Sequence, residues 1–268
     1  MTSGFLERIL PEVRASLGAE YLAGLPDAPP HRPSSLRAAL TATPGGSPSV
    51  MVEFKRRSPG RPDLGKASMP VSRFATLVRS TGARGASVLA CKPEFDGSPE
   101  TVAQVVVSTG RPVLFKDFVI DRVQLEAARR AGASAVLLIA RLDTEGRLRD
   151  GLRPLAEEAH RLGLEVLLEL HRPEELKLAN RLPWDILGVN VRDLDTLRLE
   201  PGTALETLRA ARGSSPLIAM SGIASAGEAR PLVNAGATGL LVGTGFVRSR
   251  DPEQFVRTLR ALHSAAAA

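Results

Sequence analysis

Short apolar runs alternate with amphipathic stretches along most of the chain. From residue 49 onward these runs are rich in aliphatic and β-branched residues, which is typical of strands buried on both faces. They predict strands at Val50–Lys55, Ala86–Ala90, Pro112–Lys116, Ala135–Ile139, Glu165–Glu169, Ile186–Asn190, Leu217–Met220 and Gly239–Val242. Helical spacing predicts helices at Val71–Thr81, Pro99–Ser108, Asp121–Ala131, Leu152–Leu162, Pro173–Asn180, Gly202–Ala211, Ser225–Ala235 and Pro252–Leu262.

This alternation implies a parallel sheet with right-handed crossovers, and eight strand–helix units close such a sheet into a (β/α)8 TIM barrel. A doubly wound open sheet is the alternative. The first strand is not followed by the GxGxxG motif typical of that fold, which favours the barrel.

The residues before the first strand have a different pattern. Phe5–Ser16 has helical spacing, and Gly24–Ser49 is a Pro/Gly/Ala-rich linker with a short helical turn near Ser35–Leu40. We therefore assign residues 1–48 to an N-terminal helical extension and linker that packs on the barrel, and residues 49–268 to a catalytic barrel.

Composition narrows the class of protein. The chain has 268 residues, 43% of them hydrophobic, enough for one large core. No apolar run reaches the roughly 18–20 residues that cross a bilayer, so we expect no membrane association. The single cysteine, Cys91, cannot form an internal disulfide, which favours a reducing cytoplasm, and the four histidines lack metal-ligand spacing. We expect a monomer without a metal.

The net charge of +6 raises the question of nucleic-acid binding. Arginines are spread along the chain in stretches of mixed sign, and aromatic residues make up 4% of the sequence, too few for base-stacking platforms. We therefore expect no nucleic-acid partner. The positive charge can still steer small anions toward a binding site.

Polar residues stand at the ends of four predicted strands: Lys55, Lys116, Glu169 and Asn190. Strand ends of a (β/α)8 barrel meet at one mouth, so these side chains are expected to converge, together with Glu53. Two lysines, two acids and an amide can carry out acid–base chemistry on an anionic substrate, whereas a packed core would gain nothing from them.

The last two predicted strands end in Met220-Ser221-Gly222-Ile223 and Val242-Gly243-Thr244-Gly245. Barrels of this kind commonly bind phosphate with the loops after strands seven and eight. Glycines allow backbone N–H groups to approach the phosphate, and hydroxyl groups add donors. We therefore expect a small phosphorylated substrate.

Several of these segments resemble the indole-3-glycerol-phosphate synthase family. The resemblance covers about Ser35 to the C-terminus and is carried by Val52-Glu53-Phe54-Lys55-Arg56-Arg57-Ser58-Pro59, Leu114-Phe115-Lys116-Asp117-Phe118-Val119-Ile120-Asp121, Glu165-Val166-Leu167-Leu168-Glu169-Leu170-His171, Gly188-Val189-Asn190-Val191-Arg192-Asp193-Leu194, Ser221-Gly222-Ile223 and Val242-Gly243-Thr244. It implies a carboxy-lyase of tryptophan biosynthesis that closes 1-(2-carboxyphenylamino)-1-deoxyribulose 5-phosphate to indole-3-glycerol phosphate, losing CO2 and water, without a cofactor.

The resemblance also implies catalytic roles. Lys116 would be the general acid that polarises the substrate carbonyl, and Glu169 would act in dehydration together with Lys55. Glu53 would orient Lys55, and Asn190 would hold a hydroxyl of the intermediate. Two neighbouring lysines are also expected to depress each other's pKa.

Other residues are implied to bind the substrate. Phe95 would lie against the anthranilate ring. The remainder would line the substrate or phosphate region: Ser58, Arg192, Ser221, Gly222, Gly243 and Thr244.

The chain departs from the family's usual pattern at three places. Met220 replaces the Glu of Glu-Ser-Gly, Ala90-Cys91 replaces Thr-Glu, and Ser58-Pro59-Gly60-Arg61 replaces Ser-Pro-Ser-Gly. A methionine at position 220 makes that wall more apolar and compliant. We expect these departures to affect the reaction rate and the identity of the aromatic substrate more than the class of reaction.

Three functions therefore remain open. The first is a synthase of tryptophan biosynthesis or a pathway-specific paralogue of it. The second is a related phosphate-binding barrel, an isomerase or decarboxylase that acts on another ribulose-phosphate adduct. The third is a barrel that only binds a ligand.

Overall fold

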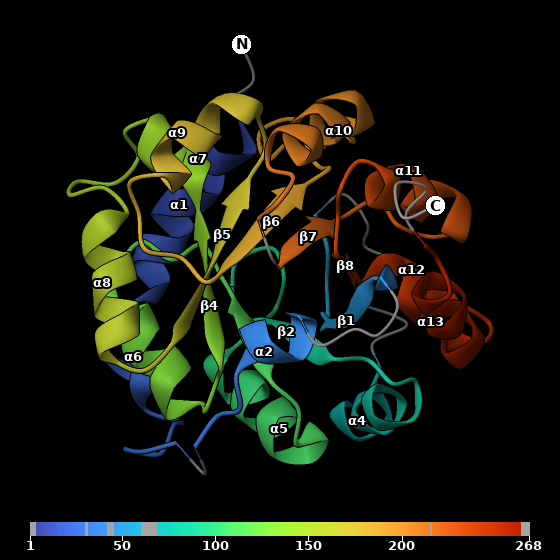
Figure 1. Ribbon diagram of the computed structural model, residues 1–268. Helices are drawn as coiled ribbons and strands as arrows, with labels where there is room; N and C mark the ends of the chain where they lie inside the picture. Colours follow the sequence, from blue (N-terminus) through green and yellow to red (C-terminus); the bar gives the residue numbers. More distant parts are fainter. Residues whose placement is uncertain (1–3, 30–31, 42–45, 60–68, 215, 264–268) are drawn as a thin grey trace.

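Eight parallel strands form a closed barrel. The computed structural model describes residues 4–29, 32–41, 46–59, 69–214 and 216–263 (Figure 1). The strands are paired in chain order, and β1 closes the barrel against β8 in the register Ser49↔Gly239 to Val52↔Val242. Their bounds are β1 Ser49–Phe54, β2 Gly85–Leu89, β3 Val113–Lys116, β4 Ala135–Ile139, β5 Glu165–Leu170, β6 Ile186–Asn190, β7 Leu217–Met220 and β8 Gly239–Val242. The predicted (β/α)8 fold is confirmed.

An outer ring of helices surrounds the barrel (Figure 1). It comprises α4 Val71–Ser80, α5 Pro99–Thr109, α6 Arg122–Arg130, α8 Arg153–Arg161, α9 Leu176–Ala179, α10 Pro201–Ala210, α11 Ala226–Asn234 and α13 Pro252–Arg260. The helix predicted at Pro173–Asn180 is instead the 3-10 turn η3, Pro173–Glu175, followed by the single turn of α9. Two further short helices, α7 (Ala140–Thr144) and α12 (Thr244–Arg248), follow β4 and β8 directly and were not predicted.

Side chains of the strands alternate between two apolar layers, as the pleat of a β-strand requires. Val50 and Val52 of β1 point outward into the layer between the strands and the helices. Met51 points inward and packs with Leu114, Leu167 and other side chains inside the barrel. The barrel interior is therefore a packed core beneath the mouth.

The N-terminal segment contributes to both ends of the barrel. It forms α1 (Phe5–Ser16), the 3-10 turn η1 (Ala19–Leu22) and α2 (Leu36–Thr41). Leu36 and Leu40 of α2 are buried in the interior cluster, and the backbone N–H of Arg37 donates to the Glu165 carboxylate at 2.8 Å. Because Glu165 is the first residue of β5, α2 covers the N-terminal end of the barrel.

The first residues of α1 lie at the opposite end. The backbone N–H of Phe5 donates to the carbonyl of Asp195 at 3.1 Å, and that of Leu6 lies 3.4 Å from the Asp195 carboxylate. Asp195 belongs to the loop after β6, so the start of α1 is attached to the mouth. Within the described residues, no helix is both long and apolar enough to span a membrane.

Candidate active site

A cavity of about 440 Å³ opens where the carboxyl ends of the strands meet. Every residue that the sequence nominated lines it: Glu53, Lys55, Ser58, Phe95, Lys116, Glu169, Asn190, Arg192, Ser221, Gly222, Gly243 and Thr244. Pro59 of the first loop also lines the cavity, whereas Gly60 and Arg61 lie outside the described residues.

Glu53 joins the two lysines of the cavity. Its Oε1 lies 3.0 Å from Nζ of Lys55, and its Oε2 lies 3.5 Å from Nζ of Lys116. Burial alone would raise the pKa of Glu53, but the two ammonium groups outweigh burial and lower this pKa to about 2. Glu53 is therefore ionised at neutral pH and pairs with both lysines, whereas the family resemblance had implied a contact with Lys55 alone.

Lys116 is held in its charged form. Burial lowers the pKa of Lys116, but the carboxylates of Glu53 and Glu169 outweigh burial and raise this pKa above its ordinary value. The expected depression by a neighbouring lysine is wrong for Lys116, because Glu53 lies between the two ammonium groups. Lys116 therefore presents a fixed positive charge to the cavity.

Glu169 at the end of β5 is almost completely buried, with 1% of its side chain exposed. The Nδ2 group of Asn190 donates to its Oε1 at 3.1 Å, while Oδ1 of Asn190 accepts from the backbone N–H of Arg192 at 3.0 Å. Burial raises the pKa of Glu169, and the attraction of Lys116 only partly offsets that effect. Glu169 therefore keeps its proton to a higher pH than an exposed glutamate does, which suits an acid or base.

The loops after β7 and β8 bring small residues to one side of the cavity. Ser221 and Gly222 both have left-handed backbone angles, with φ of 70° and 71°. A Cβ atom at Gly243 would lie 2.6 Å from Oε1 of Glu53 and 3.1 Å from Nζ of Lys55. The β8 loop therefore packs closely against the charged cluster, and glycine is needed at this approach.

Aromatic side chains line the opposite side. The ring centroids of Phe95 and Phe118 are 6.3 Å apart, and those of Phe118 and Phe5 are 6.1 Å apart. Neither Phe5 nor Phe118 was nominated. Phe118 could have been found from its position two residues after Lys116, but no sequence signal places the N-terminal Phe5 at the mouth.

Met220 forms part of an apolar wall in the cavity, together with Leu137, Ile139 and Leu241. It is 1% exposed, and a Cβ atom at Gly188 would lie 2.8 Å from its terminal methyl group. Gly188 is the register partner of Glu169 on β5. The thioether therefore covers the barrel surface next to Glu169.

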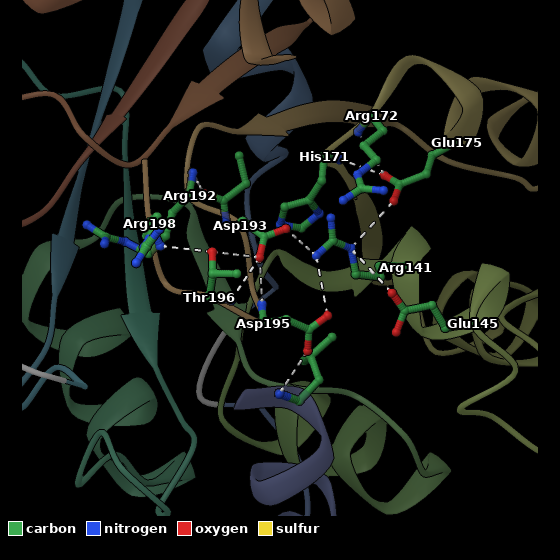
Figure 2. Close-up of polar contacts among 12 residues, drawn as sticks. Arg141, Glu145, His171, Arg172, Glu175, Arg192, Asp193, Asp195, Thr196 and Arg198 are labelled. Carbon is green, nitrogen blue, oxygen red and sulfur yellow. Dashed lines mark hydrogen bonds and ion pairs between the residues drawn. The ribbon is translucent and has the colours of Figure 1, made fainter. Parts of the chain in front are cut away.

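A buried cluster of charges lies next to the loop after β6 (Figure 2). Arg141 of α7 is 3% exposed, and its Nη1 donates to Oδ2 of Asp193 at 2.6 Å. Nη1 also lies 3.7 Å from Asp195, and Nε lies 3.9 Å from Glu175 of η3. Because Asp193 directly follows Arg192, this cluster fixes a loop that lines the cavity. Its members come from separate segments of the chain, so no sequence pattern predicted the cluster.

Comparison with known proteins gives a consistent result. The family model described as "Indole-3-glycerol phosphate synthase" matches residues 9–259. Proteins of that name from Exiguobacterium sibiricum and Koribacter versatilis are 37% and 34% identical, covering 95% and 96% of this chain and 96% and 99% of the relatives. The protein of the same name from Methanopyrus kandleri is 40% identical over 84% of this chain and 86% of its own length.

Two solved structures share the fold. The crystal structure of 3-hexulose-6-phosphate synthase superposes with a TM-score of 0.62 at 15% identity, covering 81% of this chain and 100% of that chain. Thiamine phosphate pyrophosphorylase from Pyrococcus furiosus gives a TM-score of 0.57 at 17% identity, covering 84% and 96%. The full-length sequence matches identify the family, and this chain belongs to the indole-3-glycerol phosphate synthase family.

Proposed function

We propose that the protein is a carboxy-lyase that converts 1-(2-carboxyphenylamino)-1-deoxyribulose 5-phosphate to indole-3-glycerol phosphate, CO2 and water. The observation that carries the proposal is the placement of a charged Lys116 and a buried Glu169 in one cavity with the β7 and β8 loops. The proposed reaction requires three things of the site: a group that polarises the substrate ketone, an acid–base group and a phosphate-binding site.

Ring closure is assigned to Lys116. The ring carbon that bears the carboxylate attacks the ketone carbon, and negative charge develops on the ketone oxygen. The Lys116 ammonium stabilises that charge and supplies the proton. Breakage of the bond to the carboxylate then releases CO2, and its electron pair restores the aromatic ring.

Dehydration is assigned to Glu169 and Lys55. The former ketone carbon now carries a hydroxyl, which leaves as water when Glu169 gives it a proton. The adjacent CH2 group then loses a proton to the Glu169 carboxylate, and the double bond of the new ring forms. Glu169 is suited to this transfer because its raised pKa keeps it protonated more readily than an exposed glutamate. Glu53 orients both lysines, and Asn190 holds Glu169 as well as the hydroxyl of the intermediate.

The remaining residues bind the two ends of the substrate. We assign the phosphate to the backbone and hydroxyl groups of Ser221, Gly222, Gly243 and Thr244, and the anthranilate ring to Phe95. Ser58 and Arg192 line the region between them. The ammonium of Lys116 supplies the electrophile, so we propose that no cofactor is needed.

Met220 supports a narrower version of this proposal. A thioether beside Glu169 makes the wall apolar where the family usually carries a carboxylate. Such a wall favours a substituted or less charged aromatic ring, as in a paralogue dedicated to a separate pathway.

The test is direct. Purified protein is mixed with 1-(2-carboxyphenylamino)-1-deoxyribulose 5-phosphate, and indole fluorescence and CO2 release are followed together. We expect one CO2 for each indole formed, with the same rate in the presence of a metal chelator. Absence of indole, combined with turnover of another ribulose-phosphate adduct, would refute the proposal in favour of an isomerase or decarboxylase.

A further inference from the structure

A buried histidine lies next to Glu169 and outside the cavity lining. His171 follows Glu169 by two residues at the end of β5, and 3% of its side chain is exposed. Its Nε2 lies 3.4 Å from Oε1 of Glu169. Neither ring nitrogen of His171 has a hydrogen-bond partner among the described residues, and neither does Oε2 of Glu169. A buried polar atom without a hydrogen-bond partner costs free energy of folding. If His171 served only to pack, an apolar side chain would therefore be more stable at this position.

The surroundings hold His171 in place and keep it neutral. Its backbone N–H donates to Oε2 of Glu175 at 2.6 Å, and its carbonyl accepts from Thr207 at 3.4 Å. Figure 2 shows His171 beside the Arg141 cluster. Burial and, after it, the Arg141 guanidinium lower the pKa of His171 to about 3. At neutral pH the ring therefore carries one N–H and one lone pair.

The hydrogen bond from Asn190 decides which nitrogen carries the proton. Because Nδ2 of Asn190 donates to Oε1 of Glu169, Oε1 acts as an acceptor, and in the ionised carboxylate it can only accept. The nearby Nε2 of His171 stabilises this carboxylate only as a second donor to Oε1. The exchangeable proton of Glu169 is then left on Oε2, the oxygen without a partner in the described protein.

We propose that His171 is a positioning residue for Glu169: as a neutral imidazole protonated on Nε2, it donates to Oε1 and so leaves Oε2 to exchange its proton with the substrate. The contact of 3.4 Å shortens when the substrate orders the site, as hydrogen bonds of free enzymes commonly do. This inference rests on the proposed role of Glu169 in dehydration.

Other charged groups act on the same pair and enter any pH dependence. Glu169 faces Lys116 of β3 and Glu53 of β1, and it also feels Glu175 of η3. His171 faces Arg141 of α7 and Asp193 of the loop after β6, together with Arg172 and Lys116. None of them is altered in the variants below, so a change in the pH profile reports the His171–Glu169 contact.

The experiment compares His171→Leu with His171→Gln, whose Nε2 can replace the histidine donor. We expect His171→Leu to lower kcat about 10- to 100-fold with little change in KM, the loss typical of one hydrogen bond to a charged group. Loss of a donor disfavours the carboxylate, so the kcat limb that reports Glu169 should move about one unit to higher pH. His171→Gln should restore most of kcat and the normal profile.

His160→Leu is the matched control, because His160 lies on α8 and pairs with Asp185 at the opposite end of β6. It should leave kcat and the pH profile unchanged. Equal losses in His171→Leu and His171→Gln, with an unmoved pH profile, would reduce His171 to a packing role and overturn the inference.

A measurement on the wild-type protein does not depend on how the variants fold. The ¹⁵N shifts of labelled histidine should show His171 protonated on Nε2 and not on Nδ1 between about pH 5 and 8, since its pKa is near 3. A proton on Nδ1, or an imidazolium, would overturn the inference. Because this readout needs no turnover, it separates failure of the His171 assignment from failure of the proposed reaction.

Discussion

At the scale of single residues, the site is organised by a shared carboxylate. Glu53 compensates the charge of both Lys55 and Lys116, which lets two ammonium groups face one cavity without depressing the pKa of Lys116. The sequence could nominate these residues from their positions at strand ends. The sequence could not predict that Glu53 pairs with both lysines, because the distance between side chains on β1 and β3 depends on how the barrel closes.

The first prediction concerns Lys116. Lys116→Ala should lower the rate of ring closure about 10²–10⁴-fold, the usual cost of losing a general acid. Single-turnover formation of indole fluorescence measures the effect. Lys92→Ala is the control, since Lys92 is exposed, pairs with Asp96 and is not among the residues that line the cavity, and it should be fully active. Near-normal turnover by a folded Lys116→Ala protein would show that this assignment is wrong.

The second prediction concerns the apolar wall. If the protein acts on a substituted aromatic ring, Met220→Glu should raise kcat/KM on the unsubstituted substrate and lower it on a ring-substituted one, because a buried carboxylate opposes apolar substituents. Met220→Leu, which keeps the wall apolar, is the control. If wild type already turns over the unsubstituted substrate at full rate and Met220→Glu changes nothing, the replacement is neutral.

At the scale of elements, the sequence predicted the strands best, because most of their successive residues are buried. Each strand was predicted to within one residue or so at either end, because a strand buried on both faces reads as a nearly continuous apolar run. The short helices α7 and α12 were missed because α7 follows β4 without an intervening residue and only Gly243 separates α12 from β8. The Arg141 cluster was missed because it joins α7, η3 and the loop after β6.

The third prediction separates two functions of the loop after β8. Thr244→Val should raise KM for the phosphorylated substrate with little effect on kcat, because it removes only a hydroxyl donor. Gly243→Val should raise KM strongly and also lower kcat, since its Cβ atom would displace Glu53 and Lys55. Steady-state kinetics on both variants tests this. An unchanged KM in both, or sulfate bound only elsewhere in a soaked crystal, would exclude this loop as the phosphate site.

At the scale of the whole molecule, both ends of the barrel depend on residues before β1. Helix α2 covers the N-terminal end through Leu36 and Leu40, and α1 brings Phe5 to the mouth. The sequence predicted a helix at Phe5–Ser16 and a turn near Ser35–Leu40, but not where each would dock. Docking is set by contacts such as those with Asp195 and Glu165, which lie more than a hundred residues away in the chain.

The pairing of β1 with β8 has a consequence for how the closed barrel fluctuates. Glu53 and Lys55 lie on one side of this seam and Gly243 on the other, so local opening of the seam would disrupt the proposed catalytic cluster and the proposed phosphate loop together. A ligand that binds only when the seam is closed then holds it shut: at about 100 times its Kd it stabilises the closed form by about 2.7 kcal/mol.

The fourth prediction follows for hydrogen exchange. With saturating inorganic phosphate, backbone amides of β1 and β8 should exchange up to about 100-fold more slowly, whereas those of α6 on the far side should change little. Mass spectrometry of deuterium uptake with and without phosphate measures this. Equal slowing in α6 would mean that the amides of β1 and β8 exchange only when the whole chain unfolds. The bound ligand would then stabilise the entire barrel and not the β1–β8 seam in particular.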